Sequence, residues 1–485
     1  MQPSAVRLGT PQGRGVLAAA VLGSGLTLLD GTVVNVALPT IGRDLGASLA
    51  QLQWVTNGYL LTLAGLVLLG GSLGDRFGRR RVFVVGAVWF TLASLACGLA
   101  PTPGVLVAAR LLQGVGGALL TPGSLAMIQG AFAAEDRARA IGAWSGLGGV
   151  ATAVGPLVGG LLVDHVSWRW IFLVNLPLGL LTVVAALRWV PETRDTRTSG
   201  PGGRARFDVL GAALASAALA GTTYALIEWQ GPGVWAAAAV GAVAVVWFVA
   251  HERRAPAPMV PPALFGSRTF SAANAMTFLV YAALGAVLFF LVIQLQTVSG
   301  WSALAAGLAT LPVTVCMLLL ASRGGALGER TGPRLPMSLG PLVMAGGTLL
   351  LLGAGEDLVY WRDVLPGLTV FGLGLALMVA PLTATVLAAA PDDSAGVASG
   401  INNAVARAGS LLAVAALPPA VGLSGSQYAD PAAFDAAYGS AVAACAALLA
   451  TGGVLSWLAL PAGRAGRDLT GPGGPTPASP GSGGG

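Results

Sequence analysis

The chain has 485 residues, of which 55% are hydrophobic and only 9% are charged. Soluble domains carry about a quarter charged residues, so this composition excludes a water-soluble protein. It indicates an all-α integral membrane protein that crosses the lipid bilayer many times. The net charge of +6 comes from arginines scattered over short polar segments. Because they do not gather on one face, we expect no nucleic-acid partner.

Apolar segments long enough to cross a bilayer, which takes about 20 residues, recur along the chain. The first contains Asp30 and follows Arg7 and Arg14, and we interpret it as a retained helix rather than a cleaved signal peptide. Fourteen spans are predicted, at 15–38, 52–72, 82–100, 104–128, 141–163, 170–190, 209–229, 234–250, 270–295, 304–322, 336–354, 364–390, 395–419 and 437–460.

The placement of arginine predicts the orientation, because cytoplasmic loops are rich in basic residues. With a cytoplasmic N-terminus, the predicted outer loops hold only Arg43, Arg169 and Arg362. We therefore expect a multi-pass protein of the cell membrane with both termini in the cytoplasm. The expected parts are a cytoplasmic N-terminus (1–14), a first six-helix bundle (15–190), linkers with two inserted helices (191–269), a second six-helix bundle (270–461) and a disordered cytoplasmic tail (462–485).

One unusual segment is written twice. GSLGDRFGRR at 71–80 returns as GALGERTGPR at 325–334, which indicates two duplicated halves, each with a tight turn at the membrane surface. Asp75 can accept hydrogen bonds from a helix N-terminus or pair with an arginine of a neighbouring helix. The alternative is that the arginines here only set the topology. The expected gating residues are Gly71, Gly74, Asp75, Arg76, Gly78, Arg79 and Arg80.

The second copy of this segment carries Glu329 and Pro333 in place of the aspartate and of a basic residue. We therefore expect a weaker gating role for the second copy.

Two charges inside predicted spans, Asp30 and Arg110, need an explanation. A charge at the bilayer centre costs about 2.5–3.5 kcal/mol on insertion scales, so such residues face a cavity or each other. Burial favours the neutral form of an aspartate, whereas a nearby arginine favours the ionised form. A conformational change that alters this contact makes Asp30 a candidate proton carrier. The alternative is a buried structural ion pair, or an aspartate that caps a helix break.

Five segments, taken in order, resemble the motifs of the major facilitator superfamily, in particular its fourteen-helix drug:proton antiporter branch. The resemblance implies that Arg110 takes part in proton coupling. It also implies that Gly155, Pro156, Gly159 and Gly160 form an interface that prevents leaks in exporters; generic contact between small residues is the alternative. The five segments are LDGTVVNVALP at 29–39, the copy at 71–81, RLLQGVGGA at 110–118, GPLVGG at 155–160 and WRWIFLVNLPLG at 168–179.

Other polar residues in the spans are candidates for a substrate cavity. The alternative for each is a hydrogen bond to a neighbouring helix, worth about 0.6 kcal/mol. The candidates are Asn35, Gln53, Asn57, Tyr59, Gln113, Glu228, Gln294, Asn402, Asn403 and Arg407.

These features favour a proton-coupled antiporter that exports hydrophobic or amphipathic small molecules such as drugs, antibiotics or dyes, and works as a monomer. A transporter of one metabolite, such as an amino acid, siderophore or peptide, is the alternative, and a membrane sensor or scaffold is disfavoured. The chain lacks lysine and therefore a nucleotide-binding P-loop. With no catalytic set and no metal-ligand spacing among its three cysteines and two histidines, we expect no enzyme, no metal and no cofactor.

Overall fold

The computed structural model of the chain describes residues 6–193, 208–391 and 394–462. Within these ranges, fourteen helices are long and apolar enough to cross a membrane, which confirms the predicted number of spans. The expected N-terminal segment, the first linker and the expected tail lie partly or wholly outside the described residues.

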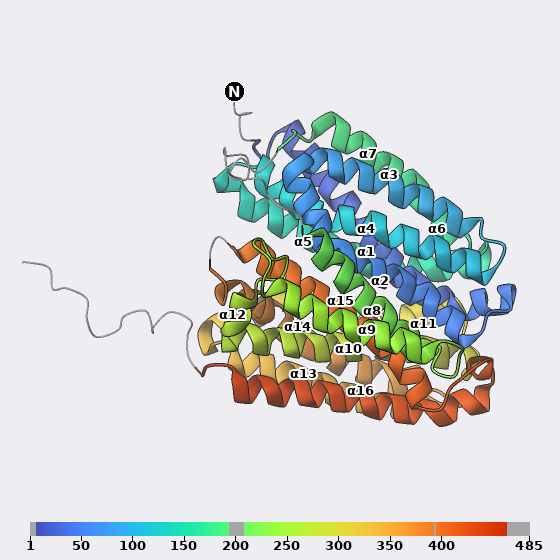
Figure 1. The fold of residues 1–485 in the computed structure, drawn as a ribbon. Helices are drawn as coiled ribbons and strands as arrows, with labels where there is room; N and C mark the ends of the chain where they lie inside the picture. Colours follow the sequence, from blue (N-terminus) through green and yellow to red (C-terminus); the bar gives the residue numbers. More distant parts are fainter. Residues whose placement is uncertain (1–5, 194–207, 392–393, 463–485) are drawn as a thin grey trace, which may run out of the picture.

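Two bundles of six spans lie side by side (Figure 1). The first consists of α1 (Pro11–Leu45), α2 (Leu49–Phe77), α3 (Arg79–Gly98), α4 (Pro103–Ala131), α5 (Ala134–His165) and the pair α6 (Trp170–Leu173) and α7 (Asn175–Trp189). The second consists of α10 (Arg268–Thr297), the pair α11 (Ala303–Ala309) and α12 (Leu311–Thr331), α13 (Arg334–Leu349), α14 (Leu365–Ala388), α15 (Ala395–Ala420) and α16 (Pro431–Ala459). The segments that connect these helices contain four short helices: η2 (Pro262–Gly266), η3 (Leu350–Gly353), η4 (Tyr360–Val364) and η6 (Gln427–Ala429).

Helix α1 extends well beyond the apolar stretch that predicted it, because capping residues define its ends. Helix α1 begins at Pro11, where the side chain of Thr10 accepts a hydrogen bond from Gly13 N. It ends before Gly46, whose φ of 62° lies in the left-handed region that glycine favours. The predicted span 15–38 is therefore only the apolar middle of this helix.

We call the face that holds the start of α1 and the end of α16 the terminal face, and the other the opposite face. Because the number of spans is even, both ends of the described chain lie on one face. The turns at Gly78 and Gly332 both lie on the terminal face and share positive φ angles of 109° and 84°. The repeated segment therefore forms the same turn in both bundles.

The two inserted helices, α8 (Val209–Ile227) and α9 (Val234–Glu252), form a hairpin. Helix α8 packs against α2 of the first bundle and α15 of the second, so the hairpin lies across the boundary between the bundles (Figure 1). Helix α9 packs against α8 and leaves many large apolar side chains exposed, Trp235 and Trp247 among them. An apolar exposed helix of this kind is suited to contact with lipid.

On the opposite face the bundles are joined by hydrogen bonds. Leu49 N donates to Gly425 O at 2.8 Å, and Tyr428 Oη donates to Ala47 O at 2.8 Å. Deeper in the structure, Gln296 Nε2 donates to Val36 O at 2.9 Å. The structure therefore captures a state in which the opposite face is closed.

Candidate functional site

A fully buried ion pair lies in the middle of the first bundle. Asp30 of α1 and Arg110 of α4 are 0% and 1% exposed, and Arg110 Nη1 donates to Asp30 Oδ2 at 2.5 Å. Removing one partner of such a pair typically costs 3–5 kcal/mol, because the other charge stays buried without compensation. The structure thus brings together the two charged residues that the sequence singled out.

The Asp30 carboxylate is held by further donors. Gln113 Nε2 donates to Oδ1 at 2.8 Å, and Asn175 Nδ2 donates to the same oxygen at 3.3 Å. Both amides also donate to the hydroxyl of Ser94, at 2.8 and 3.3 Å. We call Asp30, Ser94, Arg110, Gln113 and Asn175 the Asp30 cluster. Its members come from α1, α3, α4 and α7, so a change in the charge of Asp30 acts on four helices.

Arg110 makes contacts that do not depend on Asp30. Its Nε donates to Val55 O of α2 at 2.9 Å. Its guanidinium carbon lies 4.4 Å from the centre of the Tyr59 ring and 5.7 Å from that of Phe172. Cation–π contacts and a carbonyl acceptor keep a guanidinium stable in a dry interior. Arg110 therefore has partners on other helices besides Asp30.

The sequence missed Ser94 and Asn175 as members of the cluster. Asn175 belongs to the segment 168–179, whose resemblance to a family motif is a signal that could have identified it. A single serine in an apolar helix carries no comparable signal.

Gln53 and Asn57, two of the predicted cavity residues, lie on α2, and Gln53 contacts α15. Gln53 Nε2 donates to Val414 O at 2.7 Å and to Ala415 O at 3.1 Å, so its amide ties the two bundles together. On the same helix as Gln53, Asn57 is fully buried, and both its amide atoms lack a hydrogen-bond partner in the structure. A buried amide without partners costs about 1–3 kcal/mol per group, which marks this position for a ligand, water or another conformation.

Three further candidates on α15 have hydrogen-bonded side chains, and a fourth, on α1, has an unpartnered oxygen. Arg407 Nε donates to Asn403 Oδ1 at 3.1 Å, one turn away on α15. Asn402 Nδ2 donates to Thr277 Oγ1 of α10 at 2.8 Å, within the second bundle. Asn35 is half-buried on α1, and its Oδ1 is unpartnered.

Gln294 is bonded at the end of the second bundle that lies on the opposite face. Its Nε2 donates to Ala354 O at 2.7 Å and to Asp435 Oδ1 at 2.5 Å. The structure therefore gives Gln294 a bracing position between α10 and α16.

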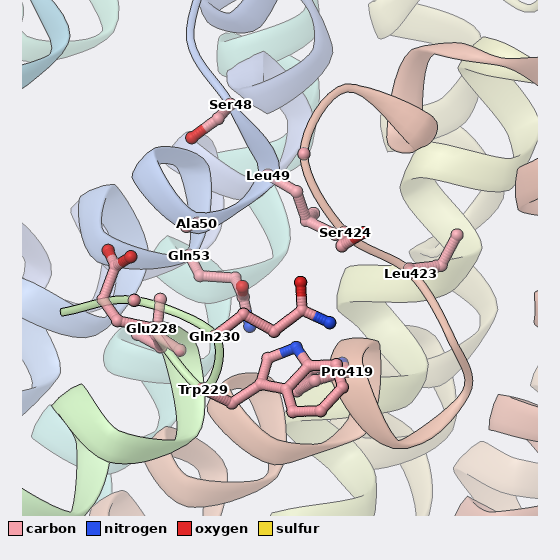
Figure 2. Close-up of a pocket in the computed structure, with 13 residues that line it drawn as sticks. Ser48, Leu49, Ala50, Gln53, Glu228, Trp229, Gln230, Pro419, Leu423 and Ser424 are labelled. Atoms are coloured by element: carbon pink, nitrogen blue, oxygen red, sulfur yellow. The ribbon is translucent and has the colours of Figure 1, made fainter. Parts of the chain in front are cut away.

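Glu228 lies on the opposite face, where it ends α8. There it lines a cavity of about 230 Å³ (Figure 2). We call this the outer cavity; its walls are the start of α2, the α8–α9 turn and the end of α15 with the loop that follows. The structure therefore places Glu228 apart from the Asp30 cluster.

A second cavity, of about 160 Å³, lies between α1 and α5. Its wall combines Leu28, the backbone at Gly148 and Gly149, and the indole of Trp144, whose Nε1 donates to Ser24 Oγ at 2.9 Å. A largely apolar surface with one aromatic group suits amphipathic molecules.

The repeated turn of the first bundle is held by an ion pair. Asp75 Oδ1 accepts from Arg79 Nε at 2.9 Å and from Arg79 Nη2 at 2.8 Å, so the end of α2 is tied to the start of α3. Arg79 Nη1 also donates to Ala126 O of α4 at 3.1 Å. Gly71 packs against Pro122 of α4. This agrees with the expected pairing of Asp75 with an arginine of a neighbouring helix.

The sequence missed one residue of this turn. Glu192, just after α7, accepts from Arg80 N at 3.2 Å and fills the space next to Gly78 where a side chain would stand. In the second bundle, Pro333 occupies the position that corresponds to Arg79. Among the described residues, Glu329 forms no ion pair.

The glycines at 155–160 let α5 approach two helices at once. Gly155 and Gly159 pack against Thr32 and Val33 of α1, while Gly160 packs against the backbone of Leu304 in α11. In return, Gly307 of α11 packs against Pro156. This segment therefore forms part of the contact between the bundles.

Asp164, near the end of α5, was not predicted. Its Oδ1 accepts from Ala303 N at 3.1 Å and its Oδ2 accepts from Leu304 N at 2.8 Å. A carboxylate of the first bundle thus caps a helix of the second. Among the described residues, no group of three or more histidine, cysteine or acidic side chains could hold a metal ion.

A polytopic helical membrane protein with two similar six-span bundles and a buried ion pair belongs to the class of secondary transporters. The chain matches the Major Facilitator Superfamily over residues 20–414 and is a member of that family.

Similar proteins include exporters and resistance proteins. The tetracenomycin C resistance and export protein of Streptomyces glaucescens is 37% identical over 83% of this chain and 74% of its own length. The puromycin resistance protein of Streptomyces alboniger is 37% identical over 94% of this chain and 93% of its own length. The multidrug resistance protein Stp of Mycobacterium tuberculosis is 37% identical over 83% and 74%.

Solved structures share the fold at low sequence identity. The xylose transporter XylE from E. coli, in a partially occluded inward open conformation, gives a TM-score of 0.63 at 15% identity over 92% of this chain and 99% of that one. A bacterial homologue of the human lysosomal transporter Spinster gives 0.62 at 18% identity, over 93% and 97%.

Proposed function

We propose that this protein is a proton-coupled antiporter that exports hydrophobic or amphipathic small molecules by alternating access. The observation that carries the proposal is the buried pair of Asp30 and Arg110, whose charges have almost no contact with solvent. A carboxylate in such a place is a functional candidate by default. The substrate class is supported by the relatives, whose names refer to tetracenomycin C, puromycin and multidrug resistance.

The Asp30 cluster supports the coupling step. With Asp30 ionised, its carboxylate accepts from Arg110, Gln113 and Asn175 and holds α1, α4 and α7 together. A proton on Asp30 weakens these charge-assisted hydrogen bonds. Arg110 then keeps its contacts with Val55 and Tyr59 of α2. Proton binding therefore changes which helices Arg110 connects, and this is the kind of two-state element that alternating access needs.

We also propose that the protein lies in the cell membrane with the terminal face in the cytoplasm. The arginines of the two repeated turns lie on this face, as cytoplasmic basic residues do. The opposite face is then the outer face, and the structure is the state closed to the outside. Each proton that moves inward down 100 mV supplies about 2.3 kcal/mol, so one or two protons can drive a useful concentration ratio.

The test uses everted membrane vesicles in which respiration generates the proton gradient. The transported substrate is the fluorescent cation ethidium. We expect transport by the natural protein to stop when an uncoupler is added, and Asp30→Asn to be inserted but inactive. The matched control is Asp44→Asn, on the same helix, where the carboxylate pairs with Arg169 at 2.9 Å but is 48% exposed. Uncoupler-sensitive transport by Asp30→Asn at the natural rate contradicts the coupling role. Transport of a single metabolite without any drug resistance favours the metabolite transporter instead.

A further inference from the structure

The outer cavity has walls from three separate parts of the chain. The first bundle contributes wall residues between positions 48 and 53, the inserted hairpin residues 227–231, and the second bundle residue 419 and residues 423–425. Leu49 N and Gly425 O, which both belong to its wall, are hydrogen-bonded at 2.8 Å. The cavity is therefore complete only while the two bundles meet on the opposite face.

The described wall of the outer cavity carries negative charge and no positive charge. Glu228 is the charged residue of its wall, and among the described residues no basic side chain pairs with it. Glu228 Oε1 accepts a single hydrogen bond of 3.3 Å from the indole of Trp54. An ionised carboxylate has room for about four acceptor bonds, so the cavity favours a cation with N–H donors.

The remaining wall suits a flat ligand. The indole of Trp229, 48% exposed, and the amide of Gln230 lie next to each other at the cavity (Figure 2). An aromatic face attracts a cation, and an amide can donate or accept. The volume of about 230 Å³ lies below the range of about 300–1,000 Å³ for drug-sized ligands. The ligand must therefore be small.

We propose that the outer cavity binds a small planar organic cation of the amidinium or guanidinium class, and that this ligand holds the opposite face closed. An amidinium can make two parallel hydrogen bonds to the Glu228 carboxylate, while the Trp229 indole stands at another part of the wall (Figure 2). A ligand that binds the closed state alone shifts the equilibrium toward it. At ten times its dissociation constant, such a ligand lowers the open population about elevenfold. The inference rests on the proposed function for the orientation of this face and for the transport cycle.

The test uses benzamidine, with neutral benzamide of the same shape as the control ligand. The reporter is a thiol introduced by Ser424→Cys at an exposed position of the wall, and the three natural cysteines are all buried. A membrane-impermeant maleimide labels this thiol from outside in right-side-out vesicles. We expect benzamidine, and not benzamide, to slow labelling about tenfold. We expect Glu228→Gln to remove the protection and Glu356→Gln, an exposed carboxylate in a loop outside the cavity, to keep it.

Ethidium efflux by the same variants provides the second measurement. We expect external benzamidine to slow efflux about tenfold in the natural protein and in Glu356→Gln, but to leave Glu228→Gln unaffected. Protection that persists in Glu228→Gln, or equal protection by benzamide, overturns the proposal. Normal uncoupler-sensitive efflux without any protection overturns this inference and leaves the proposed function standing. Protection without proton-driven efflux overturns the proposed function and leaves the binding site standing.

Discussion

The carboxylate of Asp75 and the guanidinium of Arg79 face each other across the turn at Gly78, with 2.8 Å between Oδ1 and Nη2. The Asp75 side chain is 41% exposed, and an exposed ion pair is worth about 0.2–1 kcal/mol. The pair therefore adjusts the position of α3 against α2 rather than keeping the protein folded.

We expect Asp75→Asn to slow turnover about twofold, because a change of this size in a barrier corresponds to that factor. The apparent affinity for substrate should stay the same. Initial rates of ethidium efflux over a range of concentrations separate the two quantities. The matched control is Glu329→Gln in the second copy, where Pro333 leaves the acid without an ion pair among the described residues. Equal slowing by both substitutions would show that the ion pair is not responsible.

The sequence predicted what depends on strong local signals. Fourteen apolar stretches predicted fourteen spans, because the bilayer sets a minimum length that few other structures require. Asp30 and Arg110 stood out as rare charges in apolar helices, and the structure pairs them. The length of α1 beyond 15–38 was missed, since capping residues are polar and resemble loop residues.

Positions that depend on which helices meet could not be predicted. Ser94 and Asn175 become important only because α3 and α7 bring them to Asp30. Asp164 follows the predicted span 141–163 and resembles an ordinary loop acid until α11 is placed beside it. Glu228 was predicted only as a residue of a substrate cavity, and the contact of α8 with both bundles, which places it at the outer cavity, carries no signal in the sequence.

The close approach of Gly160 to Leu304 gives a steric prediction. A methyl group on Gly160 would meet the backbone of Leu304, so we expect Gly160→Ala to separate α5 from α11. Overfilling of this kind costs about 1–3 kcal/mol, which corresponds to roughly a 5- to 150-fold loss of the closed state. The control is Gly146→Ala on the same helix, where no atom lies within 4 Å. Normal efflux by Gly160→Ala contradicts the tight contact.

The hairpin of α8 and α9 has its own charged contact on the terminal face. Asp208 accepts from Gly211 N at 2.7 Å, and its Oδ1 lies 2.6 Å from His251 Nε2. Burial favours the neutral acid, but the hydrogen bonds from Gly211 and His251 outweigh it and hold the pKa of Asp208 below its ordinary value of 3.8. The ionised carboxylate therefore stabilises the folded hairpin.

A pKa lowered by folding contributes stability above the unfolded pKa, and this is lost as the pH falls through the folded-state pKa. We expect Asp208→Asn to lower the free energy of unfolding at pH 7 by about 1.5–3 kcal/mol, the usual worth of a hydrogen bond to a charged group. Thermal unfolding in detergent, at pH 7 and at a series of pH values below 4, measures this loss of stability. The difference from the natural protein should shrink toward the acid end. A difference that does not depend on pH contradicts a role for the charge.

The carboxylate of Asp164 joins the bundles on the opposite face, which is the outer face in the proposed orientation. It caps α11 through Ala303 N and Leu304 N at 3.1 and 2.8 Å. Loss of a cap costs about 0.5–2 kcal/mol, so Asp164→Ala should favour the outward-open state by roughly 2- to 30-fold. A thiol introduced by Leu49→Cys reports this opening, because Leu49 is 2% exposed in the closed state. We expect an impermeant maleimide to label it faster in the presence of Asp164→Ala, and at the original rate with His165→Ala, the next residue.

Since the cap stabilises the closed state without touching the Asp30 cluster, Asp164→Ala should keep the sensitivity of efflux to an uncoupler. Unchanged labelling of the thiol would show that the cap does not control the outer gate.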